Sequence, residues 1–311
     1  MSKEKILITC PCDEFLVEGL KNLRYEVEYS PEITLEKVHE KLPTLSGIII
    51  ATRVGLNKQD LEKASQLKFI ARAGSGLDHV DVQFAESRGI KCITAPEGNR
   101  DGVGEHAVGL MLAAFHKIVE TANEVSNGKF PTPEFRSMEL KGNTIGIIGF
   151  GNTGEATTKR LAGFDVRVLA FDKYRTGFGN AQVEECSLDK ILDEASVISF
   201  HVPLTSETKY FADEKFFLQW RNPSLLVNTS RGAVVKSSAL LHAIDSGKLK
   251  MATLDVLENE NPPAMNEEEK KIFSRLISHP KIIITPHIAG KTNHSMRRFA
   301  EIILKRIAEI Q

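Results

Sequence analysis

Residues 144–172 constrain what this chain can fold into more than any other stretch. The run begins with apolar and β-branched residues at 144–148, which are typical of a strand buried on both faces. A glycine-rich turn, a segment with helical spacing of apolar residues and a second apolar strand follow, and this strand ends on Asp172. Strand, glycine turn, helix, strand and acid stand in the order that a dinucleotide-binding unit requires.

Each glycine of this turn has a physical role. Gly149 permits the tight turn, Gly151 lets the backbone approach a pyrophosphate, and Gly154 lets helix and strand pack closely. The helix that follows offers unpaired N–H groups and a positive dipole end to the phosphates. Asp172 lies about 20 residues downstream, where a carboxylate accepts hydrogen bonds from ribose hydroxyls and repels a 2′-phosphate. A glycine turn alone often binds nothing, but the strand before it and the helix after it favour a dinucleotide site. The carboxylate of Asp172 favours NAD over NADP as the ligand of that site.

Composition excludes several classes of protein. The 311 residues suffice for two domains with cores, and 41% hydrophobic and 26% charged residues are ordinary for a soluble globular protein. The formal net charge of -1 gives no global attraction to nucleic acid or to a membrane. No segment has the apolar length of a membrane span, and the apolar run at 6–9 is too short for a signal peptide. We therefore expect a cytoplasmic protein that meets anionic ligands with local arginines.

The cysteines point to reduced thiols. Cys10 and Cys12 flank a proline, while Cys92 and Cys186 stand alone. Because no second pair has metal-binding spacing, we expect neither a disulfide nor a metal site.

Strand-like and helix-like segments alternate along almost the whole chain. Apolar runs at 6–8, 47–51 and 69–71 alternate with segments that begin at residues able to cap helices, and the same alternation resumes after Asp172. This order predicts an α/β fold with two doubly wound parallel sheets. The turn-rich segment 95–99 marks the first boundary between them.

Residues 101 to about 125 have the pattern of one long helix. Its stretch 107–115 is apolar nearly all round, which indicates burial on more than one side. A core position between domains explains this burial, and so does a dimer interface. The following residues, 127–135, are predicted to form an exposed loop. Within the helix, His106 is predicted to have a structural role, paired with Glu105.

Three polar residues stand just beyond the ends of consecutive predicted strands in the second half. In a parallel sheet these ends line one edge, beside the nicotinamide end of a cofactor. Arg231 can hold a 2-hydroxy carboxylate with two hydrogen bonds and polarise the 2-oxo group. His287 can take the hydroxyl proton, and Glu260 can fix the tautomer of His287 through the other ring nitrogen. Each residue alone has a structural explanation, but together they favour an active site.

The first half carries two further candidates. Gly74, Ser75 and Gly76 directly follow a strand, where their N–H groups can hold a carboxylate, although a plain turn is the alternative. Arg53 also follows a strand end and is a candidate anion contact, with a solvated surface arginine as the alternative.

At these residues the sequence resembles the NAD-dependent D-isomer-specific 2-hydroxyacid dehydrogenases, over nearly the whole chain. The resemblance rests on residues 73–78, 149–154, 201–205, 227–232, 254–256 with Glu260, and 285–290. It implies hydride transfer between NAD(H) and a D-2-hydroxy or 2-oxo acid, with Arg231, Glu260 and His287 as the catalytic triad.

The resemblance also implies ligand contacts. Asp255 would contact the nicotinamide carboxamide, and Ser75 and Gly76 the substrate carboxylate. The substrate would lie against Arg53, Gly74, Ser75, Gly76, Arg231 and His287. The cofactor would lie against Ser75, Gly149, Gly151, Asn152, Thr153, Gly154, Asp172, His201, Val202, Pro203, Thr229, Ser230, Asp255, Ala289 and Gly290.

In this family the substrate domain is discontinuous. The resemblance implies that residues 1–98 and 289–311 form a flavodoxin-like substrate-binding domain and that residues 99–288 form the Rossmann NAD-binding domain. It also implies a cleft between the two domains, and a homodimer formed with the help of the long helix after Glu105.

The segment 96–100 most resembles short D-3-phosphoglycerate dehydrogenases, enzymes of serine biosynthesis. Because the sequence ends at Gln311, we expect no C-terminal regulatory domain. Ala51 stands where relatives specific for the phosphorylated substrate often carry an arginine, so either Arg53 substitutes or the substrate is glyoxylate, hydroxypyruvate or another unphosphorylated acid. An NAD-sensing corepressor-like binding protein is the alternative from another class.

Overall fold

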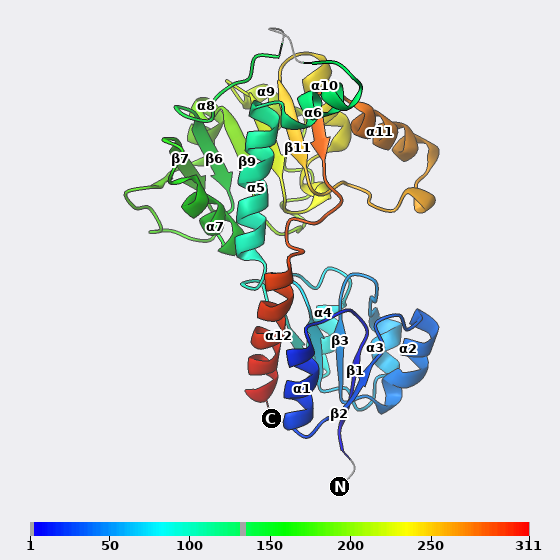
Figure 1. The fold of residues 1–311 in the computed structure, drawn as a ribbon. Coiled ribbons are helices and arrows are strands. Elements are labelled where there is room, and N and C mark those ends of the chain that lie inside the picture. The colour runs from blue at the N-terminus through cyan, green and yellow to red at the C-terminus, as the bar shows by residue number, and fades with distance from the viewer. Residues whose placement is uncertain (1–2, 131–134, 311) are drawn as a thin grey trace. The chain divides into compact units, whose positions relative to one another are not determined.

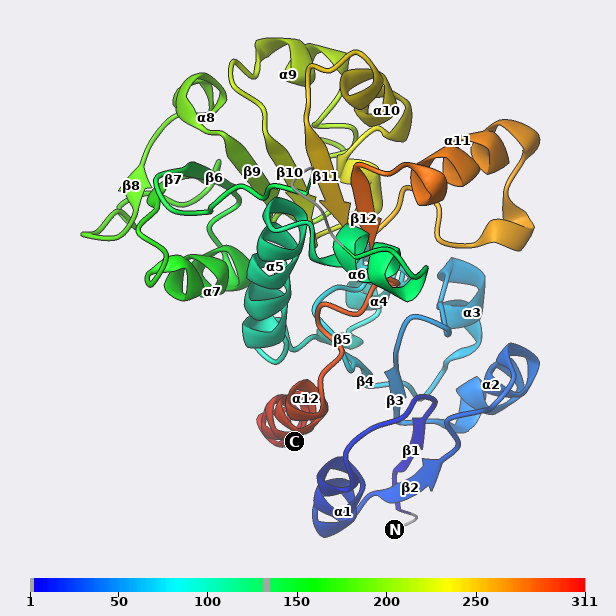
Figure 2. The same ribbon diagram turned by 45° about the horizontal axis from the view of Figure 1, so that its top comes forward.

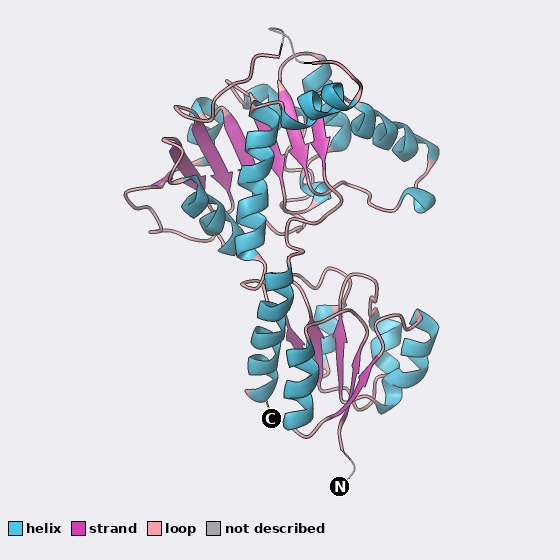
Figure 3. Ribbon diagram, viewed as in Figure 1, coloured by secondary structure: helices cyan, strands magenta, loops and turns pink. Residues whose placement is uncertain are grey.

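The computed structural model describes residues 3–130 and 135–310, so residues 131–134 of the predicted loop lie outside the described part. The chain divides into two compact units (Figure 1). Unit 1 consists of Met1–Asn99 and Lys291–Gln311, and unit 2 consists of Arg100–Gly290. Helices cover both faces of one parallel sheet in each unit (Figure 3), which confirms the predicted fold class.

Unit 1 contains a sheet with the strand order β2-β1-β3-β4-β5, whose paired strands run parallel. This flavodoxin-like order reverses its direction of growth between β1 and β3. The strands are β1 (Lys5–Ile8), β2 (Glu26–Tyr29), β3 (Gly47–Ile50), β4 (Phe69–Arg72) and β5 (Lys91–Ile93). The helices are α1 (Glu14–Asn22), α2 (Leu35–Lys41), α3 (Lys58–Lys63), α4 (Val82–Ser87) and α12 (Asn293–Ala308), with a 3₁₀ turn at Leu42–Thr44.

Two hydrophobic cores cover opposite faces of this sheet. One contains Val38, Leu61 and Ala85 from α2, α3 and α4. The other contains Leu16 of α1 and Ile303 of α12, so segments from the two ends of the chain share one core (Figure 1).

Unit 2 contains a sheet with the order β12-β11-β10-β9-β6-β7-β8, again with parallel pairs. The sheet grows in both directions from β6, so its switch point lies between β6 and β9. The strands are β6 (Thr144–Ile148), β7 (Arg167–Phe171), β8 (Glu184–Glu185), β9 (Val197–Phe200), β10 (Leu225–Asn228), β11 (Met251–Leu254) and β12 (Ile282–Ile284).

The helices of unit 2 also pack on both faces of their sheet (Figure 2). Met111 and Leu161, from α5 and α7, belong to one core, while Ile191, Phe216 and Leu240, from α8, α9 and α10, belong to the other. The helices are α5 (Arg100–Phe115), α6 (Ile118–Ser126), α7 (Asn152–Leu161), α8 (Leu188–Glu194), α9 (Glu214–Gln219), α10 (Ser237–Asp245) and α11 (Glu267–Ser278), with 3₁₀ turns at Gly232–Val234 and Pro262–Ala264.

The strand registers of unit 2 create one continuous row of residues at the carboxyl edge of the sheet. Pairing aligns the strand-end residues Ile148, Phe171, Phe200, Asn228, Leu254 and Ile284. The residues that directly follow them are, in spatial order, Asp172, Gly149, His201, Thr229, Asp255 and Thr285. Ligands of open α/β sheets bind along this edge, at the switch point.

The prediction of one long helix from residue 101 to about 125 is wrong. α5 ends at Phe115 and α6 begins at Ile118. Lys117 between them has φ 51°, in the left-handed region that a right-handed helix does not contain. Most apolar residues of α5 are buried, whereas α6 buries none of its residues in this chain.

The starts of two other helices, α7 and α10, bear on the loops at the carboxyl edge. α7 begins at Asn152, so the second half of the glycine turn is already helical. The side chain of Ser237 does not cap α10; instead the Ser237 N–H donates to the Glu258 carboxylate at 3.1 Å. Local spacing cannot reveal a cap that comes from another loop.

Candidate active site

The glycine turn after β6 has the conformation expected of a phosphate cradle. Gly149 has φ 93°, and a Cβ there would lie 2.6 Å from the carbonyl oxygen of His201. A side chain at this position would therefore separate β6 from β9. Asn152, Thr153 and Gly154 form the first turn of α7. The N–H groups of such a turn lack partners within the helix and suit an anion.

Asp172 braces this turn from the end of β7. Its Oδ2 accepts the Phe150 N–H at 2.8 Å, and its Oδ1 accepts the N–H groups of Tyr174 and Arg175 at 2.9 and 3.0 Å. A carboxylate has about four acceptor positions. Asp172 can therefore hold the turn and still accept a hydrogen bond from a ribose hydroxyl.

His201 is buried at the end of β9, with Val202 and Pro203 after it. Its Nε2 lies 2.9 Å from Ser199 Oγ, and burial lowers the pKa of His201 to about 3. The ring is therefore neutral at physiological pH, and His201 is not suited to donate a proton to a ligand there.

Asn228, at the end of β10, shapes the turn that carries Arg231. The Asn228 Nδ2 donates to the Arg231 carbonyl at 2.9 Å, and its Oδ1 accepts the N–H and hydroxyl of Ser230 at 3.1 and 2.8 Å. Arg231 Nη1 donates to the Ser230 carbonyl at 2.9 Å. A Cβ on Gly232 would lie 1.8 Å from the Leu257 carbonyl oxygen, so this turn packs directly against the loop that carries Glu260.

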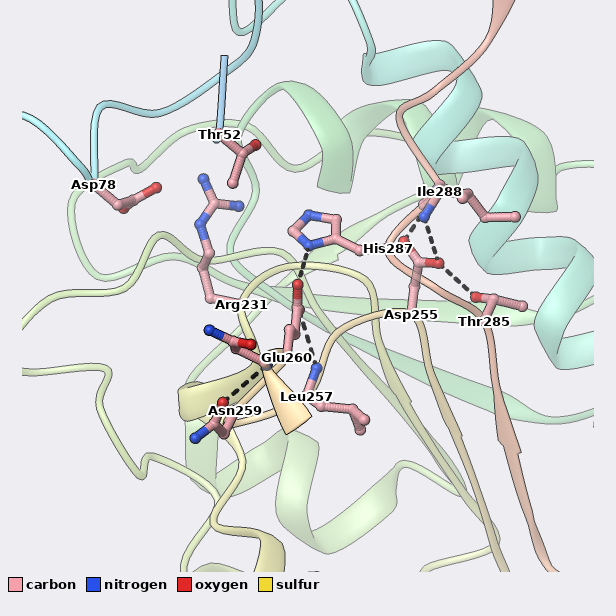
Figure 4. A network of polar contacts seen from close by, with 12 residues as sticks. Thr52, Asp78, Arg231, Asp255, Leu257, Asn259, Glu260, Thr285, His287 and Ile288 are labelled. Atoms are coloured by element: carbon pink, nitrogen blue, oxygen red, sulfur yellow. Dashed lines mark hydrogen bonds and ion pairs between the residues drawn. The ribbon is translucent and has the colours of Figure 1, made fainter. Parts of the chain in front are cut away.

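Glu260 and His287 form a hydrogen-bonded pair. His287 Nδ1 lies 2.8 Å from Glu260 Oε2, and Glu260 Oε1 accepts the Leu257 N–H at 3.2 Å (Figure 4). Because an ionised carboxylate only accepts hydrogen bonds, the neutral histidine carries its proton on Nδ1. Nε2 is then the nitrogen that exchanges a proton with a ligand.

Asp255 organises the segment around His287. It is 1% exposed and accepts the N–H groups of Ile288 and Ala289 at 2.9 and 2.8 Å, while the Thr285 hydroxyl donates to its Oδ1. Burial would raise the pKa of Asp255, but hydrogen bonds from His106, Thr285 and these two N–H groups hold that pKa below its usual value. The carboxylate is therefore ionised. Ala289 and Gly290, two of the predicted cofactor contacts, are the last two residues of unit 2.

The edge also contains buried polar atoms that suit a bound cofactor. Among the residues that the structure describes, Thr229 Oγ1 and His201 Nδ1 are buried without a hydrogen-bond partner. Such atoms are uncommon in folded proteins. Both belong to the row between the glycine turn and His287, so the residues fit a dinucleotide lying along the edge.

Unit 1 has a glycine turn of its own after β4, formed by Gly74, Ser75 and Gly76. Arg72, the last residue of β4, donates to the Gly76 carbonyl and to Thr52 Oγ1, the latter at 3.3 Å. The arginine thus braces the turn that was predicted to hold a carboxylate. Sequence reasoning missed Arg72, although a charged residue ending an apolar strand before a glycine turn was a visible signal.

Arg53 lies in unit 1 and directs its guanidinium to backbone carbonyls. It donates to the backbone carbonyls of Ile33, Thr9 and Pro31, the last at 2.6 Å. These bonds use three of the five N–H groups of the guanidinium. The geometry therefore gives Arg53 a role in joining strand-end loops, and its contact with a substrate anion stays a prediction.

His106 has another partner than the one expected. Glu105 contacts Arg160 at 3.4 Å, whereas His106 Nε2 lies 3.0 Å from Thr285 Oγ1. Sequence reasoning missed this contact because 179 residues separate the partners. From the sequence, Asn228 was included only within the motif 227–232, and its hydrogen bonds to the turn that carries Arg231 were not predicted.

Other kinds of site find no support in the described residues. Within residues 3–130 and 135–310, no group of three or more His, Cys, Asp or Glu side chains could hold a metal ion. The four cysteines are free. No helix in the same ranges has the length and apolarity to cross a membrane.

Residues 108–289 match the protein family described as the NAD-binding domain of D-isomer specific 2-hydroxyacid dehydrogenases. This match covers more than half of the chain and most of unit 2. It includes the glycine turn, Asp172 and the loops that carry Arg231, Glu260 and His287.

Individual relatives agree with the family. The chain is 31% identical to the hydroxypyruvate reductase of Thermotoga maritima over 99% of this chain and 98% of that protein. It is 32% identical to the D-3-phosphoglycerate dehydrogenase of Archaeoglobus fulgidus over 98% of this chain but only 57% of that protein. The chain therefore spans little more than half the length of the latter relative.

A solved structure adds evidence on the cofactor. The D-lactate dehydrogenase of Aquifex aeolicus, crystallised with NAD and lactic acid, superposes with a TM-score of 0.86 at 26% identity, over 99% of this chain and 95% of that one. The chain therefore belongs to the D-isomer specific 2-hydroxyacid dehydrogenase family, an oxidoreductase family, and residues 108–289 match its NAD-binding domain.

Proposed function

We propose that this protein transfers hydride between NAD(H) and a D-2-hydroxy acid or the matching 2-oxo acid. The observation that carries the proposal is the 2.8 Å pair of His287 and Glu260 on the sheet edge that also carries Arg231 and the glycine turn. NADH, when bound, supplies the hydride that reduces carbon 2. Unit 1, residues 1–99 and 291–311, would bind the substrate, with the Gly74–Gly76 turn taking the carboxylate.

Arg231 orients the substrate in this proposal. A planar guanidinium donates two parallel hydrogen bonds, which suits a carboxylate and an adjacent 2-oxo oxygen. The Asn228 bonds to the Arg231 turn limit its movement. The positive charge would stabilise the negative charge that develops on the 2-oxo oxygen during reduction.

His287 and Glu260 would move the proton. In reduction, His287 Nε2 donates a proton to the oxygen of carbon 2, and in oxidation it takes that proton back. Glu260 stabilises the imidazolium through Nδ1 and keeps the ring oriented. Tight NADH binding without turnover of any 2-oxo acid would instead favour the corepressor-like binding protein.

For the substrate, we propose D-3-phosphoglycerate as the leading candidate, with a role in serine biosynthesis. The 32% identity to a D-3-phosphoglycerate dehydrogenase supports it. Hydroxypyruvate or glyoxylate is the second candidate. Arg53 favours this alternative, because its guanidinium is bound to backbone carbonyls and Ala51 offers no positive charge.

One assay separates these functions. The purified chain is given NADH with hydroxypyruvate, glyoxylate and 3-phosphohydroxypyruvate, and in the other direction NAD with D-3-phosphoglycerate. A kcat/KM at least tenfold higher for the phosphorylated acid supports the first candidate, and the reverse order supports the second. Inactivity toward every acid of the panel would refute both substrate candidates, and inactivity toward all other 2-oxo acids as well would refute the proposed function.

We also propose that the protein is a homodimer that acts in the cytoplasm, where its free cysteines would stay reduced. α6 buries no residue, and the exposed fractions of Ile118, Val119 and Val125 are 52%, 43% and 46%. Clustered exposed apolar side chains of this kind favour association with a second copy.

The oligomeric state tests this part. We expect light scattering to give a dimer for the unmodified chain and a monomer for Ile118→Glu. Ile277→Glu, at a 55% exposed position of α11, is the matched control and should leave the dimer intact. A monomeric unmodified chain would refute the dimer.

A further inference from the structure

A half-buried histidine on α5 contacts the network around Asp255. His106 Nε2 lies 3.0 Å from Thr285 Oγ1 and 3.5 Å from Asp255 Oδ1. The three residues come from α5, from the end of β12 and from the end of β11. His106 belongs to none of the motifs that define the family resemblance, and the reaction described above gives it no role.

The direction of these hydrogen bonds follows from counting protons. The Thr285 hydroxyl has one proton, and it donates this proton to Asp255 Oδ1. Thr285 Oγ1 must then accept from His106, so His106 carries a proton on Nε2. Because a hydroxyl proton rotates freely, an acceptor on one side and a donor on the other fix its orientation.

Asp255 transmits this arrangement to His287. The Asp255 carboxylate holds the N–H groups of Ile288 and Ala289, and its backbone carbonyl accepts the His287 N–H at 2.8 Å. His287 has φ 54°, a left-handed conformation that costs energy for a residue with a Cβ. These bonds on both sides of His287 maintain the strained conformation that directs its ring toward Glu260.

We propose that His106 is a positioning residue for this reaction: it holds the Thr285 hydroxyl on Asp255, so that Asp255 keeps the His287 segment in its left-handed conformation. The proposal rests on the proposed function, in which His287 transfers the proton. His106 touches neither the transferred proton nor the substrate carboxylate. Its loss should therefore lower kcat without changing the KM for the acid. It should also weaken NADH binding, because Asp255 is a predicted contact of the cofactor.

The test compares His106→Leu with His106→Gln. The glutamine amide can place an N–H close to the position of the histidine Nε2–H, whereas leucine removes the donor. We expect His106→Leu to lower kcat about tenfold and to raise the Kd for NADH about threefold, the effect of losing roughly one hydrogen bond. We expect His106→Gln to restore most of both losses, and the KM for the 2-oxo acid to stay unchanged in both variants.

His279→Leu is the matched control. His279 is another half-buried histidine of unit 2, and its Nε2 also lies 3.5 Å from an aspartate, Asp245. It has no contact with the Asp255 network among the interactions of the described residues, so its kcat and NADH affinity should equal those of the unmodified chain. If His106→Leu does not fold, Thr285→Val removes the hydroxyl that joins His106 to Asp255 and should likewise lower kcat and weaken NADH binding.

Several results would overturn the proposal. They are an unchanged kcat and NADH affinity in His106→Leu, a glutamine variant no better than the leucine variant, and an equal loss in His279→Leu. A failure of the proposed function looks different, because the unmodified chain would then reduce no 2-oxo acid. In that case, NADH binding by fluorescence titration still tests the positioning role, and an unchanged Kd in His106→Leu would refute it.

Discussion

The two sheets of this protein have similar architecture but use their carboxyl edges differently. In unit 2, side chains at the strand ends pair with each other: His287 with Glu260, and Asp255 with Thr285. In unit 1, the strand-end arginines Arg53 and Arg72 donate to backbone carbonyls. The edge of unit 2 therefore contains pairs of strand-end side chains, whereas the arginines of unit 1 shape the loops at their edge.

This contrast explains why a charged residue at a strand end is weak evidence of function. Parallel strands leave carbonyl groups and turns at their carboxyl ends, and a guanidinium satisfies several carbonyls at once. Arg53 and Arg231 follow strands in the same way in the sequence. Their surroundings in the fold make the difference. Arg53 donates hydrogen bonds to three backbone carbonyls of neighbouring loops, whereas Asn228 donates a hydrogen bond to the backbone carbonyl of Arg231.

The largest effect should follow from removing the proton-transfer group of unit 2. We expect His287→Ala to lower kcat about 1,000-fold, the usual scale for general acid–base catalysis, with NADH binding retained. Steady-state kinetics and NADH fluorescence measure the two quantities. A near-normal kcat would mean that His287 does not transfer the proton.

The next effect should come from Arg231→Lys. Lysine keeps the positive charge but lacks the planar pair of donors, so we expect kcat/KM for the 2-oxo acid to fall about 100-fold. Initial rates across substrate concentrations measure it. If lysine supports normal kcat/KM, charge alone suffices and the two-bond geometry is unnecessary.

Asp172→Ala should act at the other end of the same edge. The variant loses an acceptor for the ribose and for the Phe150 N–H, so we expect the Kd for NADH to rise about tenfold and the preference over NADPH to shrink. Titration with both cofactors measures this. An unchanged preference would remove Asp172 from cofactor selection.

His201 should make stability depend on pH. Its pKa is about 3 when folded and about 6.5 when unfolded, so the unfolded chain binds the extra proton between these values. Stability is fully present above pH 6.5 and falls by at most about 1.4 kcal/mol per pH unit on acidification. Urea unfolding at several pH values should give a smaller fall for His201→Asn; an equal fall would contradict the assignment.

The smallest effect on activity should follow from Arg53→Ala in unit 1. We expect a loss of about 1 kcal/mol in the free energy of unfolding, because three carbonyls lose a partially exposed donor, and kcat/KM within about twofold of the unmodified chain. Denaturation and kinetics check the two parts. A large rise in KM for a phosphorylated acid would instead restore Arg53 as a substrate contact.

The sequence by itself determined the alternation of strands and helices, the glycine turn and the strand-end positions of Arg231, Glu260 and His287. These features depend on local periodicity and on residues a few positions apart, which sequence preserves directly. It did not locate the break at Lys117, since a left-handed lysine has no local signature of the kind that glycine provides.

Only the tertiary structure decided which polar groups meet. The contacts of His106 with Thr285 and of Arg53 with Thr9 join residues far apart in the chain, and nothing in the spacing of either residue reveals its partner. Strand order and register bring such residues together. Two arginines that look equivalent in sequence can therefore end with different roles.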